Sequence, residues 1–309
     1  MSAQAKRPEG VEPNFPLGRL TTIRTGGAAE WFALAGALDR LERLLKWAQE
    51  ATLDVGVVGS GSNLLVADEG VRGLVVKLDG ELARIDHEHD RLICGGGARL
   101  PQASARAASL GLSGLEFGVN IPGTVGGAVR MNANAYGGEL GRVLDWVDVS
   151  TPAGTTRRRP EDLGFAYRRS NLGPREVVAR ACFLLERSKP EAIKEVLADM
   201  RRRRREAQPS GIKTFGSTFK NPDDPRAEGR TAGQLLEAAG CKGLQVGSAR
   251  FSPKHANFVE NVGGAASTND VLAVIAEGRR RVREQFGVEL ETEVQLLGGS
   301  AREAGSPDK

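Results

Sequence analysis

Apolar positions along the chain follow two spacings, one typical of helices and one typical of strands. In residues 38–50 (LDRLERLLKWAQE), the leucines and Ala48 recur at every third or fourth position and share one helical face. The small-residue stretch 101–112 contains Gly111, a typical helix stop. We expect helices at 38–50, 101–112, 190–206, 231–240 and directly after the capping residues 267–270.

Shorter runs rich in β-branched residues predict strands between these helices. We expect strands at 73–78, 91–96, 143–150, 177–186, 256–261 and 290–297, and a strand, a glycine-rich turn and a short apolar run within 54–66. This mixture predicts an α+β fold. The pattern changes near Pro209, which separates a region at 14–208 from a smaller domain at 209–298.

The two ends of the chain show no pattern of this kind. We expect residues 1–13 to be disordered and 299–309 to form a flexible tail. The first residues have no apolar core, so they do not resemble a signal peptide. The chain also has no run of about 18 apolar residues, so we expect no membrane span. The three cysteines are scattered, without metal-like spacing, which favours buried thiols in a reducing, cytoplasmic compartment and predicts no metal site.

The formal net charge of +4 depends strongly on the arginines of residues 201–206 (RRRRRE). Such a run can bind nucleic acid, but no aromatic residue is interleaved with it for base stacking. It ends a helical pattern, where arginine is favoured near the C-terminus. We interpret it as a solvated helix end, with binding of an anionic small ligand as an alternative, and expect no nucleic-acid partner. An RNA-binding protein is a further alternative, and it would explain none of the glycine-rich loops described next.

Glycine is abundant, with 40 residues, and gathers in loops that favour close backbone approach to a ligand. Residues 59–63 (GSGSN) do not fit a dinucleotide fingerprint, because Leu64 stands where a third glycine is needed. Residues 120–141 contain a longer stretch with few side chains, and a further glycine pair lies in 22–32. Backbone N–H groups in such turns can hold a pyrophosphate. Together the three segments predict a dinucleotide-like ligand.

Ser217 lies in GSTFKNP (216–222), a segment typical of a site. A nucleophilic serine needs a base, usually histidine, and the chain has only His87, His89 and His255. The first two lie in a polar, turn-like stretch, and nothing in the sequence places His255 beside Ser217. Anion ligand, proton donor and turn residue therefore all stay open on the residues alone.

The order of several motifs resembles one known family across residues 14–298. They are IRTGGAAEW, VGSGSNLLV, GLEFGVNIPGTVGGAVRMNANAYGGEL, FAYRRSNL, GSTFKNP, SPKHANFVEN and LETEVQLLG. This sequence resembles the UDP-N-acetylenolpyruvoylglucosamine reductases of peptidoglycan precursor synthesis. The resemblance implies a two-part FAD-binding region of the vanillyl-alcohol-oxidase type at 14–208, with subdomains at 14–78 and 79–208, and a substrate domain at 209–298. It leaves the oligomeric state open.

The resemblance also implies a reaction and its cofactors. NADPH reduces FAD, and the enolpyruvyl ether of a UDP-sugar then receives the hydride, giving UDP-N-acetylmuramate. The cofactor-binding residues would be Gly59, Ser60, Gly61, Ser62, Asn63, Ile121, Pro122, Gly123, Thr124, Gly126, Gly127 and Ala128. Related flavin oxidases of small alcohols or sugars are the alternative. They often tether FAD to a histidine beside the turn that reads RTGGAAEW here, and Ala28 is no tether, so we expect non-covalent FAD.

By the same resemblance, Arg168, Ser217 and Glu293 are the catalytic residues. Tyr167, Lys220, Asn221 and His255 are the substrate-binding ones. Hydride addition places negative charge beside the substrate carboxylate, which an arginine can bind with two parallel hydrogen bonds. Ser217 would then be a proton donor, and Glu293 could donate to the carboxylate only if burial kept it protonated.

The sequence departs from the family pattern in two loop positions. Asn120 and Asn134 stand where the family usually has glycine, and asparagine tolerates left-handed backbone well enough to preserve both turns. No tyrosine lies between residues 171 and 215, so the chain resembles the shorter type of this family, which lacks an extra loop with a tyrosine.

Overall fold

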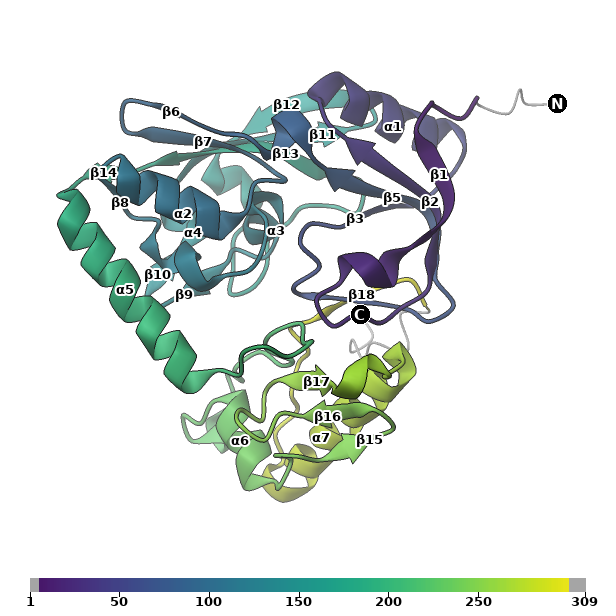
Figure 1. Ribbon diagram of the computed structural model, residues 1–309, viewed down its shortest axis with the longest axis vertical. Coiled ribbons are helices and arrows are strands. Elements are labelled where there is room, and N and C mark those ends of the chain that lie inside the picture. Colours follow the sequence, from purple (N-terminus) through teal and green to yellow (C-terminus); the bar gives the residue numbers. More distant parts are fainter. Residues whose placement is uncertain (1–5, 300–309) are drawn as a thin grey trace. The chain divides into compact units, whose positions relative to one another are not determined.

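The computed structural model describes residues 6–299, and the chain contacts divide it into two compact units. Within the described residues, the first unit comprises 6–15, Glu30–Ser60 and Arg72–Arg204. The second comprises Pro16–Ala29, Gly61–Val71 and 205–299. Helices and strands are mixed in both, which confirms the α+β expectation (Figure 1). The expected change near Pro209 lies close to the last unit boundary, but two earlier segments also belong to the second unit.

The first unit is built on two sheets. One has the order β1 (Val11–Pro16), β2 (Ala28–Ala35), β5 (Val71–Leu78) and β3 (Val55–Val57), with β3 and β5 parallel. The other is antiparallel, with the order β12 (Gly154–Arg158), β11 (Leu144–Thr151), β13 (Val177–Leu184), β7 (Arg91–Gly95) and β6 (Ile85–Glu88). Short pairs join β8 (Leu112–Ser113) to β14 (Glu186–Arg187) and β9 (Asn134–Ala135) to β10 (Gly138–Glu139).

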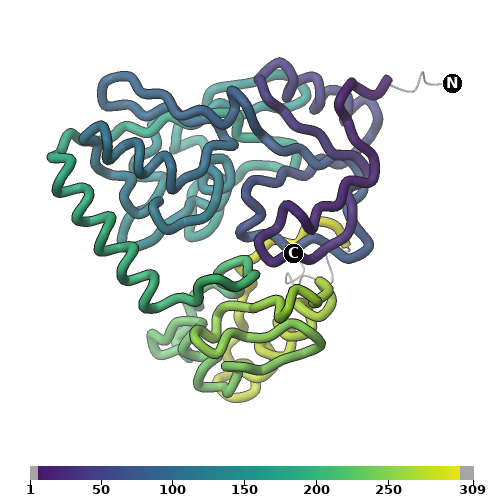
Figure 2. Tube along the Cα trace, viewed as in Figure 1, coloured from purple at the N-terminus to yellow at the C-terminus, as the bar shows by residue number. Residues whose placement is uncertain are grey.

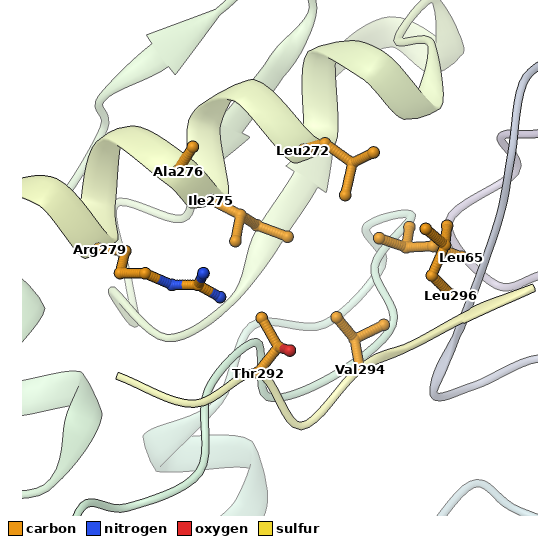
Figure 3. A pocket seen from close by; sticks show the side chains of 8 residues that line it. All are labelled: Leu65, Leu272, Ile275, Ala276, Arg279, Thr292, Val294 and Leu296. Carbon is orange, nitrogen blue, oxygen red and sulfur yellow. The ribbon is translucent and has the colours of Figure 1, made fainter. Parts of the chain in front are cut away.

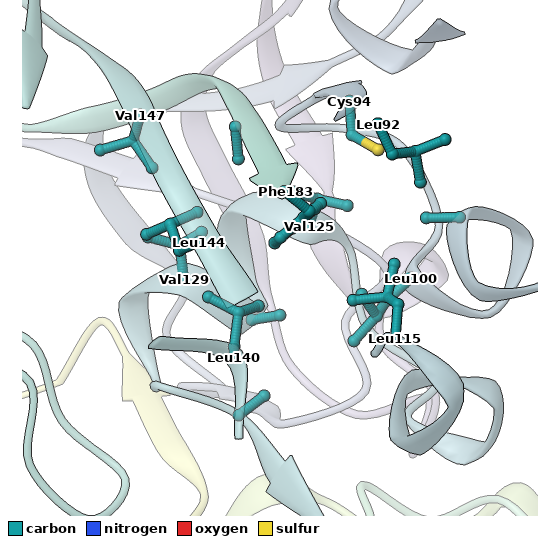
Figure 4. Close-up of a cluster of buried hydrophobic side chains, with 14 of the residues drawn as sticks. Leu92, Cys94, Leu100, Leu115, Val125, Val129, Leu140, Leu144, Val147 and Phe183 are labelled. Atoms are coloured by element: carbon teal, nitrogen blue, oxygen red, sulfur yellow. The ribbon is translucent and has the colours of Figure 1, made fainter. Parts of the chain in front are cut away.

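Helices α1 (Leu38–Glu50), α2 (Leu100–Ser109) and α3 (Val125–Arg130) pack against these sheets. Helix α4 (Leu140–Val143) directly precedes β11, and α5 (Pro190–Ala207) packs through Ile193 and Leu197 against Ala108 and Val119. The face of α1 that carries Leu41, Leu44 and Leu45 is fully buried in one apolar cluster. A second cluster packs α2 and α3 against β7, β11 and β13, with Phe183 among its largest side chains (Figure 4). Burial of these side chains is the main stabilising term of the unit.

The second unit combines a small sheet with two helices. Strands β15 (Gln245–Val246), β16 (Ala249–Phe251) and β17 (Val259–Asn261) are antiparallel, and α6 (Ala232–Ala238) and α7 (Thr268–Phe286) complete the core. Helix α7 begins at a capping box, in which the Ser267 hydroxyl accepts from the Asp270 N–H at 3.0 Å, and it ends at Gly287. Strand β4 (Leu64–Val66) pairs in parallel with β18 (Gln295–Leu297). Figure 2 shows the course of the chain, coloured by residue number.

Short 3₁₀ helices connect these elements. They are η1 (Leu17–Leu20), η2 (Gly80–Ala83), η3 (Glu116–Asn120), η4 (Pro160–Leu163), η5 (Pro225–Ala227) and η6 (Val262–Gly264). No helix within residues 6–299 is long and apolar enough to cross a membrane. Cys94, Cys182 and Cys241 are buried free thiols, and burial raises the pKa of Cys94 to about 12.

Two expectations from the sequence differ from the structure, and a third concerns residues that lie almost entirely outside the described part of the chain. Residues 11–13 were expected to be disordered but belong to β1, an edge strand that is mostly exposed and has only one buried residue, Val11. His87 lies in β6, another exposed edge strand, so only His89 is in the turn. The flexible tail expected at 299–309 lies outside the described residues apart from its first position.

The run of arginines at the end of α5 is not solvated throughout. Arg201, Arg202, Arg203 and Arg205 are exposed, but Arg204 is half-buried and its guanidinium donates to the Asn120 carbonyl. Burial lowers the pKa of Arg204 from its usual value. This arginine therefore ties α5 to the start of the long glycine-rich loop, and the expectation of a wholly solvated helix end was wrong at this position.

Among the described glycines of the first unit, Gly96 has the least space for a side chain. A Cβ atom there would lie 1.9 Å from the Val178 carbonyl oxygen. We predict that Gly96→Ala lowers the free energy of unfolding by about 1–3 kcal/mol, because β13 must move to accept the methyl group. Gly36→Ala is the control, since no heavy atom lies within 4 Å of its Cβ. Equal midpoints for the two variants in urea unfolding would contradict this packing.

Candidate functional site

The two predicted cofactor loops of the first unit lie against each other. The Ser60 hydroxyl donates to the Pro122 carbonyl at 2.5 Å, and a Cβ atom on Gly59 would lie 2.4 Å from Oγ1 of Thr124. The Lys77 ammonium donates to the Gly59 carbonyl at 2.7 Å, and burial lowers its pKa. The structure thus brings residues 59–60 and 121–128 into one surface, as a shared ligand would require.

The glycines of the second loop differ in what surrounds them. A Cβ on Gly126 would lie 3.0 Å from the Gly96 carbonyl oxygen, so packing within the chain favours a glycine at this position. The nearest atom to a Cβ on Gly123 would be 3.8 Å away, and on Gly127 3.5 Å away, which is ordinary contact. Neither has a left-handed backbone. Packing within the protein does not require these two glycines, so space for a ligand is left where a side chain would lie, and these residues fit a large cofactor such as FAD.

The remainder of the first loop, Gly61–Asn63, lies in the second unit. Gly61 has φ 64°, and its carbonyl accepts from the Thr22 N–H at 3.0 Å. The Asn63 side chain donates to the Glu293 carbonyl at 3.2 Å, and the Asn63 carbonyl accepts from the Gln295 N–H at 3.1 Å. A predicted cofactor residue is therefore directly bonded to the backbone of a predicted catalytic residue.

The third glycine-rich segment has a different explanation. A Cβ on Gly26 would lie 2.4 Å from the Val66 side chain, and one on Gly27 would lie 2.4 Å from the Asp68 carbonyl. Both glycines are thus required by packing inside the second unit. Their presence is no indication of a cofactor, although it suggested one in the sequence.

Arg168 occupies a strained turn in the first unit. Ala166 and Arg169 exchange two backbone hydrogen bonds, at 3.0 and 3.1 Å, so Tyr167 and Arg168 form the tip of a tight turn. Arg168 has φ 56° at the third turn position, where glycine is the usual residue. Its guanidinium donates to the Asn134 carbonyl at 3.2 Å and lies 5.6 Å from the Tyr167 ring centroid. Strain of this kind is concentrated at functional sites.

In the second unit, the structure places Ser217 and Glu293 on neighbouring backbone segments. Ser217 forms a bridge with Phe258, and Phe219 forms an antiparallel bridge with Thr292. The Glu293 N–H donates to the Thr218 carbonyl at 2.8 Å, and the Lys220 N–H donates to the Glu291 carbonyl at 2.9 Å. The expected strand at 290–297 is therefore divided, because 291–293 pairs with 218–220 and only the last residues form β18.

The three glutamates that alternate near the C-terminus differ in their surroundings. Glu289 is exposed and forms an ion pair with Arg283, and Glu291 is exposed and forms an ion pair with Lys220. Glu293 is half-buried. Its neighbours Thr292 and Val294 line a small, mostly apolar pocket of about 50 Å³ together with residues of α7 (Figure 3). Glu293 thus lies in the least solvated position of the three.

The other predicted substrate residues of the second unit are held by their own contacts. The Asn221 side chain accepts from the Ala232 N–H at 3.2 Å, at the start of α6. His255 is half-buried, its Nδ1 accepts from the Asn257 N–H at 3.2 Å, and its ring meets Phe258 edge to face. Burial lowers the pKa of His255 below its usual 6.5, so the imidazole is neutral at neutral pH and carries its proton on Nε2.

Comparison with known proteins gives consistent results along the whole chain. A family model for the C-terminal domain of UDP-N-acetylenolpyruvoylglucosamine reductase matches residues 208–297, and one for an FAD binding domain matches residues 29–159. The reductase of Anaeromyxobacter dehalogenans (strain 2CP-1) is 44% identical over 92% of this chain and 84% of its own length. That of Gluconobacter oxydans is 42% identical over 93% of this chain and 92% of its own.

A solved structure agrees with the sequence relatives. The crystal structure of UDP-N-acetylenolpyruvylglucosamine reductase from Thermus caldophilus has 38% sequence identity and a TM-score of 0.81, and the match covers 93% of this chain and 99% of that one. This chain belongs to the UDP-N-acetylenolpyruvoylglucosamine reductase family. The family predicted from the motifs is therefore confirmed.

The family models divide the predicted site residues between them. The FAD binding domain match contains every predicted cofactor residue, and the reductase C-terminal match contains Ser217, Lys220, Asn221, His255 and Glu293. Tyr167 and Arg168 lie between the two matches. Within the reductase fold, Arg168 belongs to the first unit, and Ser217 and Glu293 belong to the second. Their individual roles in this reductase stay predictions.

One residue with a structural part in the site was missed in the sequence. Asn257 is buried and bonds through its side chain to the backbone of Phe219. The stretch 256–261 indicated only a strand, and in fact only Val259–Asn261 is one. A polar residue inside an expected buried strand was the available signal, because a buried amide must find hydrogen-bond partners.

Proposed function

We propose that this chain reduces the enolpyruvyl ether of UDP-N-acetylglucosamine enolpyruvate to UDP-N-acetylmuramate, a step in peptidoglycan precursor synthesis, with FAD and NADPH as cofactors. The observation that carries the proposal is the sequence identity of 42–44% between this chain and reductases of this name. The matches cover at least 92% of this chain and at least 84% of each relative. The paired segments that carry Ser217 and Glu293 support it, since they offer a proton donor and a second polar group side by side. We place the reaction in the cytoplasm, where NADPH and UDP-sugars are found.

The cofactor would be held without a covalent bond by the loops at 59–63 and 121–128. Gly123 and Gly127 leave the backbone accessible, and the contacts of Gly59 and Ser60 with the second loop keep that surface in shape. FAD, when bound, supplies the hydride that it accepts from NADPH. The protein has to position the substrate carbons, stabilise the charge that forms and deliver one proton.

Arg168 would bind the enolpyruvyl carboxylate. Hydride addition to the β-carbon leaves negative charge on the α-carbon and its carboxylate, and a guanidinium can stabilise that charge with two parallel hydrogen bonds. The left-handed backbone of Arg168 supports this role. Arginine disfavours this conformation, and strained residues of this kind are concentrated at functional sites. The carbonyl of Asn134 orients the same guanidinium.

Ser217 would donate the proton that the α-carbon receives, so the double bond gains one hydride and one proton in total. Its hydroxyl recovers a proton from solvent afterwards, and no histidine base is needed. Glu293 would hydrogen-bond the carboxylate as a donor, which requires its protonated form. Tyr167, Lys220, Asn221 and His255 would bind the remainder of the substrate, and a phosphate would compete with Glu291 for the Lys220 ammonium.

The proposed function as a whole is tested by the visible spectrum of the purified protein. We expect a flavin spectrum that bleaches anaerobically with NADPH and returns when UDP-N-acetylglucosamine enolpyruvate is added. The flavin should leave the chain on denaturation, since its binding is non-covalent. A colourless protein that takes up no added FAD would refute the proposal, and a reduced flavin that the sugar does not reoxidise would refute the substrate.

Removal of the Ser217 hydroxyl separates the two half-reactions. We predict that Ser217→Ala leaves reduction of the flavin by NADPH unchanged and slows reoxidation by the sugar at least about 100-fold, the usual range for loss of a positioned proton donor. Stopped-flow absorbance of the flavin measures both rates. Normal reoxidation in this variant would show that Ser217 is a turn residue rather than the acid.

The shape of the guanidinium is tested by a conservative substitution. Arg168→Lys should slow sugar reoxidation about 100-fold, because lysine keeps the charge but loses the two-pronged geometry. Arg169→Lys is the matched control, since Arg169 is adjacent and exposed. We expect near-normal reoxidation in the control. Equal rates in the two variants would leave the carboxylate-binding role of Arg168 without support.

A further inference from the structure

The side-chain amide of Asn257 forms hydrogen bonds to the backbone two residues after Ser217. Its Oδ1 accepts from the Phe219 N–H at 2.9 Å, and its Nδ2 donates to the Phe219 carbonyl at 2.9 Å. The amide therefore pairs with Phe219 through both of its polar groups, as a neighbouring strand would. Since one partner is a donor and the other an acceptor, only this orientation of the amide satisfies both.

The main chain of the same residue adds a third bond. The Asn257 carbonyl accepts from the Thr218 N–H at 2.8 Å. One residue therefore binds three of the polar backbone groups of Thr218 and Phe219, which directly follow Ser217. The Thr218 carbonyl, on the other edge, accepts from the Glu293 N–H. Ser217 is thus linked to Asn257 through Thr218 and Phe219, and to Glu293 through Thr218.

Burial makes these contacts hard to replace. Asn257 is 5% exposed, Phe219 is 1% exposed and Thr218 is fully buried. Water cannot take over the Phe219 N–H and carbonyl if the amide is removed, and unpaired buried groups force a rearrangement of the backbone. Such a rearrangement would reach Ser217, which is two residues before Phe219 and bridges Phe258, the residue after Asn257 in the chain.

We propose that Asn257 is a positioning residue for proton transfer, which sets the backbone of Ser217 in register with that of Glu293. The inference rests on the proposed function, in which Ser217 donates the proton. Asn257 itself touches neither the hydride donor nor the substrate, and it acts through the two residues between itself and the proposed acid. A displacement of about 1 Å at a reacting group can slow its step about 100-fold.

A purely structural role predicts a different result. If Asn257 only stabilised the second unit, its loss would lower the thermal midpoint and leave the rates of the folded enzyme unchanged. If it positions Ser217, the folded holoenzyme should lose sugar reoxidation and keep reduction by NADPH. The comparison of the two half-reactions therefore distinguishes positioning from stability.

The experiment compares Asn257→Leu with two reference variants of the full-length holoenzyme. Leucine has a similar volume but makes neither hydrogen bond. We expect sugar reoxidation to slow about 10- to 100-fold, in the direction of Ser217→Ala, with flavin reduction within about twofold of the unsubstituted enzyme. Ser267→Ala is the control for stability, since it removes the N-cap of α7 in the same unit and should lower the thermal midpoint without changing either half-reaction.

A second variant tests the same contact if leucine prevents folding. In Asn257→Asp, a protonated carboxyl group can accept from the Phe219 N–H and donate to its carbonyl, whereas an ionised one repels the carbonyl. Burial raises the pKa of a carboxyl group, so its protonated form is gained as the pH falls. The ratio of the variant's reoxidation rate to that of the unsubstituted enzyme should therefore rise toward lower pH.

Each outcome decides the question. Selective slowing of reoxidation in Asn257→Leu, or recovery of Asn257→Asp at low pH, supports the positioning role. Normal reoxidation in a folded Asn257→Leu variant, or a pH-independent ratio for Asn257→Asp, overturns it. Failure of the unsubstituted enzyme to reoxidise with the sugar would instead refute the proposed function, so the two failures are distinguishable.

Discussion

The backbone of residues 218–220 is hydrogen-bonded along both edges, and the candidate chemistry of the second unit depends on this. Thr218 and Phe219 bond to Asn257 on one side, and Thr218 and Lys220 bond to residues 291–293 on the other. Each of these segments carries a predicted site residue or lies next to one. Their relative positions are therefore set by main-chain geometry, which is stiffer than contacts between flexible side chains.

The candidate residues of the first unit are held by a different constraint. Arg168 adopts a left-handed backbone that glycine would adopt at no steric cost, and the two backbone bonds across its turn keep it there. The glycines of the cofactor loops differ from one another: a Cβ atom on Gly59 or Gly126 would lie within 3.0 Å of a neighbouring atom, whereas one on Gly123 or Gly127 would make only ordinary contacts. A glycine that the protein itself does not require is the better indication of a ligand.

The second unit combines segments that are far apart in the sequence. The loop 59–63 crosses from the first unit to the second between Ser60 and Gly61, and its end bonds to the segment that carries Glu293. Residues 64–66 then supply β4, which pairs with β18. A segment close to the N-terminus therefore completes the second unit, and the sequence pattern near Pro209 could not reveal this, because a non-local pairing leaves no local signal.

The sequence by itself determined the elements whose signals are local. Helix α1 spans the expected residues 38–50, α7 starts at its capping box, and the loop glycines and motif order indicated the family before any geometry was known. Edge strands β1 and β6 were missed, because strands with few buried residues lack the apolar alternation that predicts them. Only the tertiary structure decided which of three alternating glutamates is half-buried, which glycines are open to a ligand, and that Asn257 pairs with Phe219. Each of these depends on contacts between residues far apart in the chain, and such contacts are settled by packing rather than by local preference.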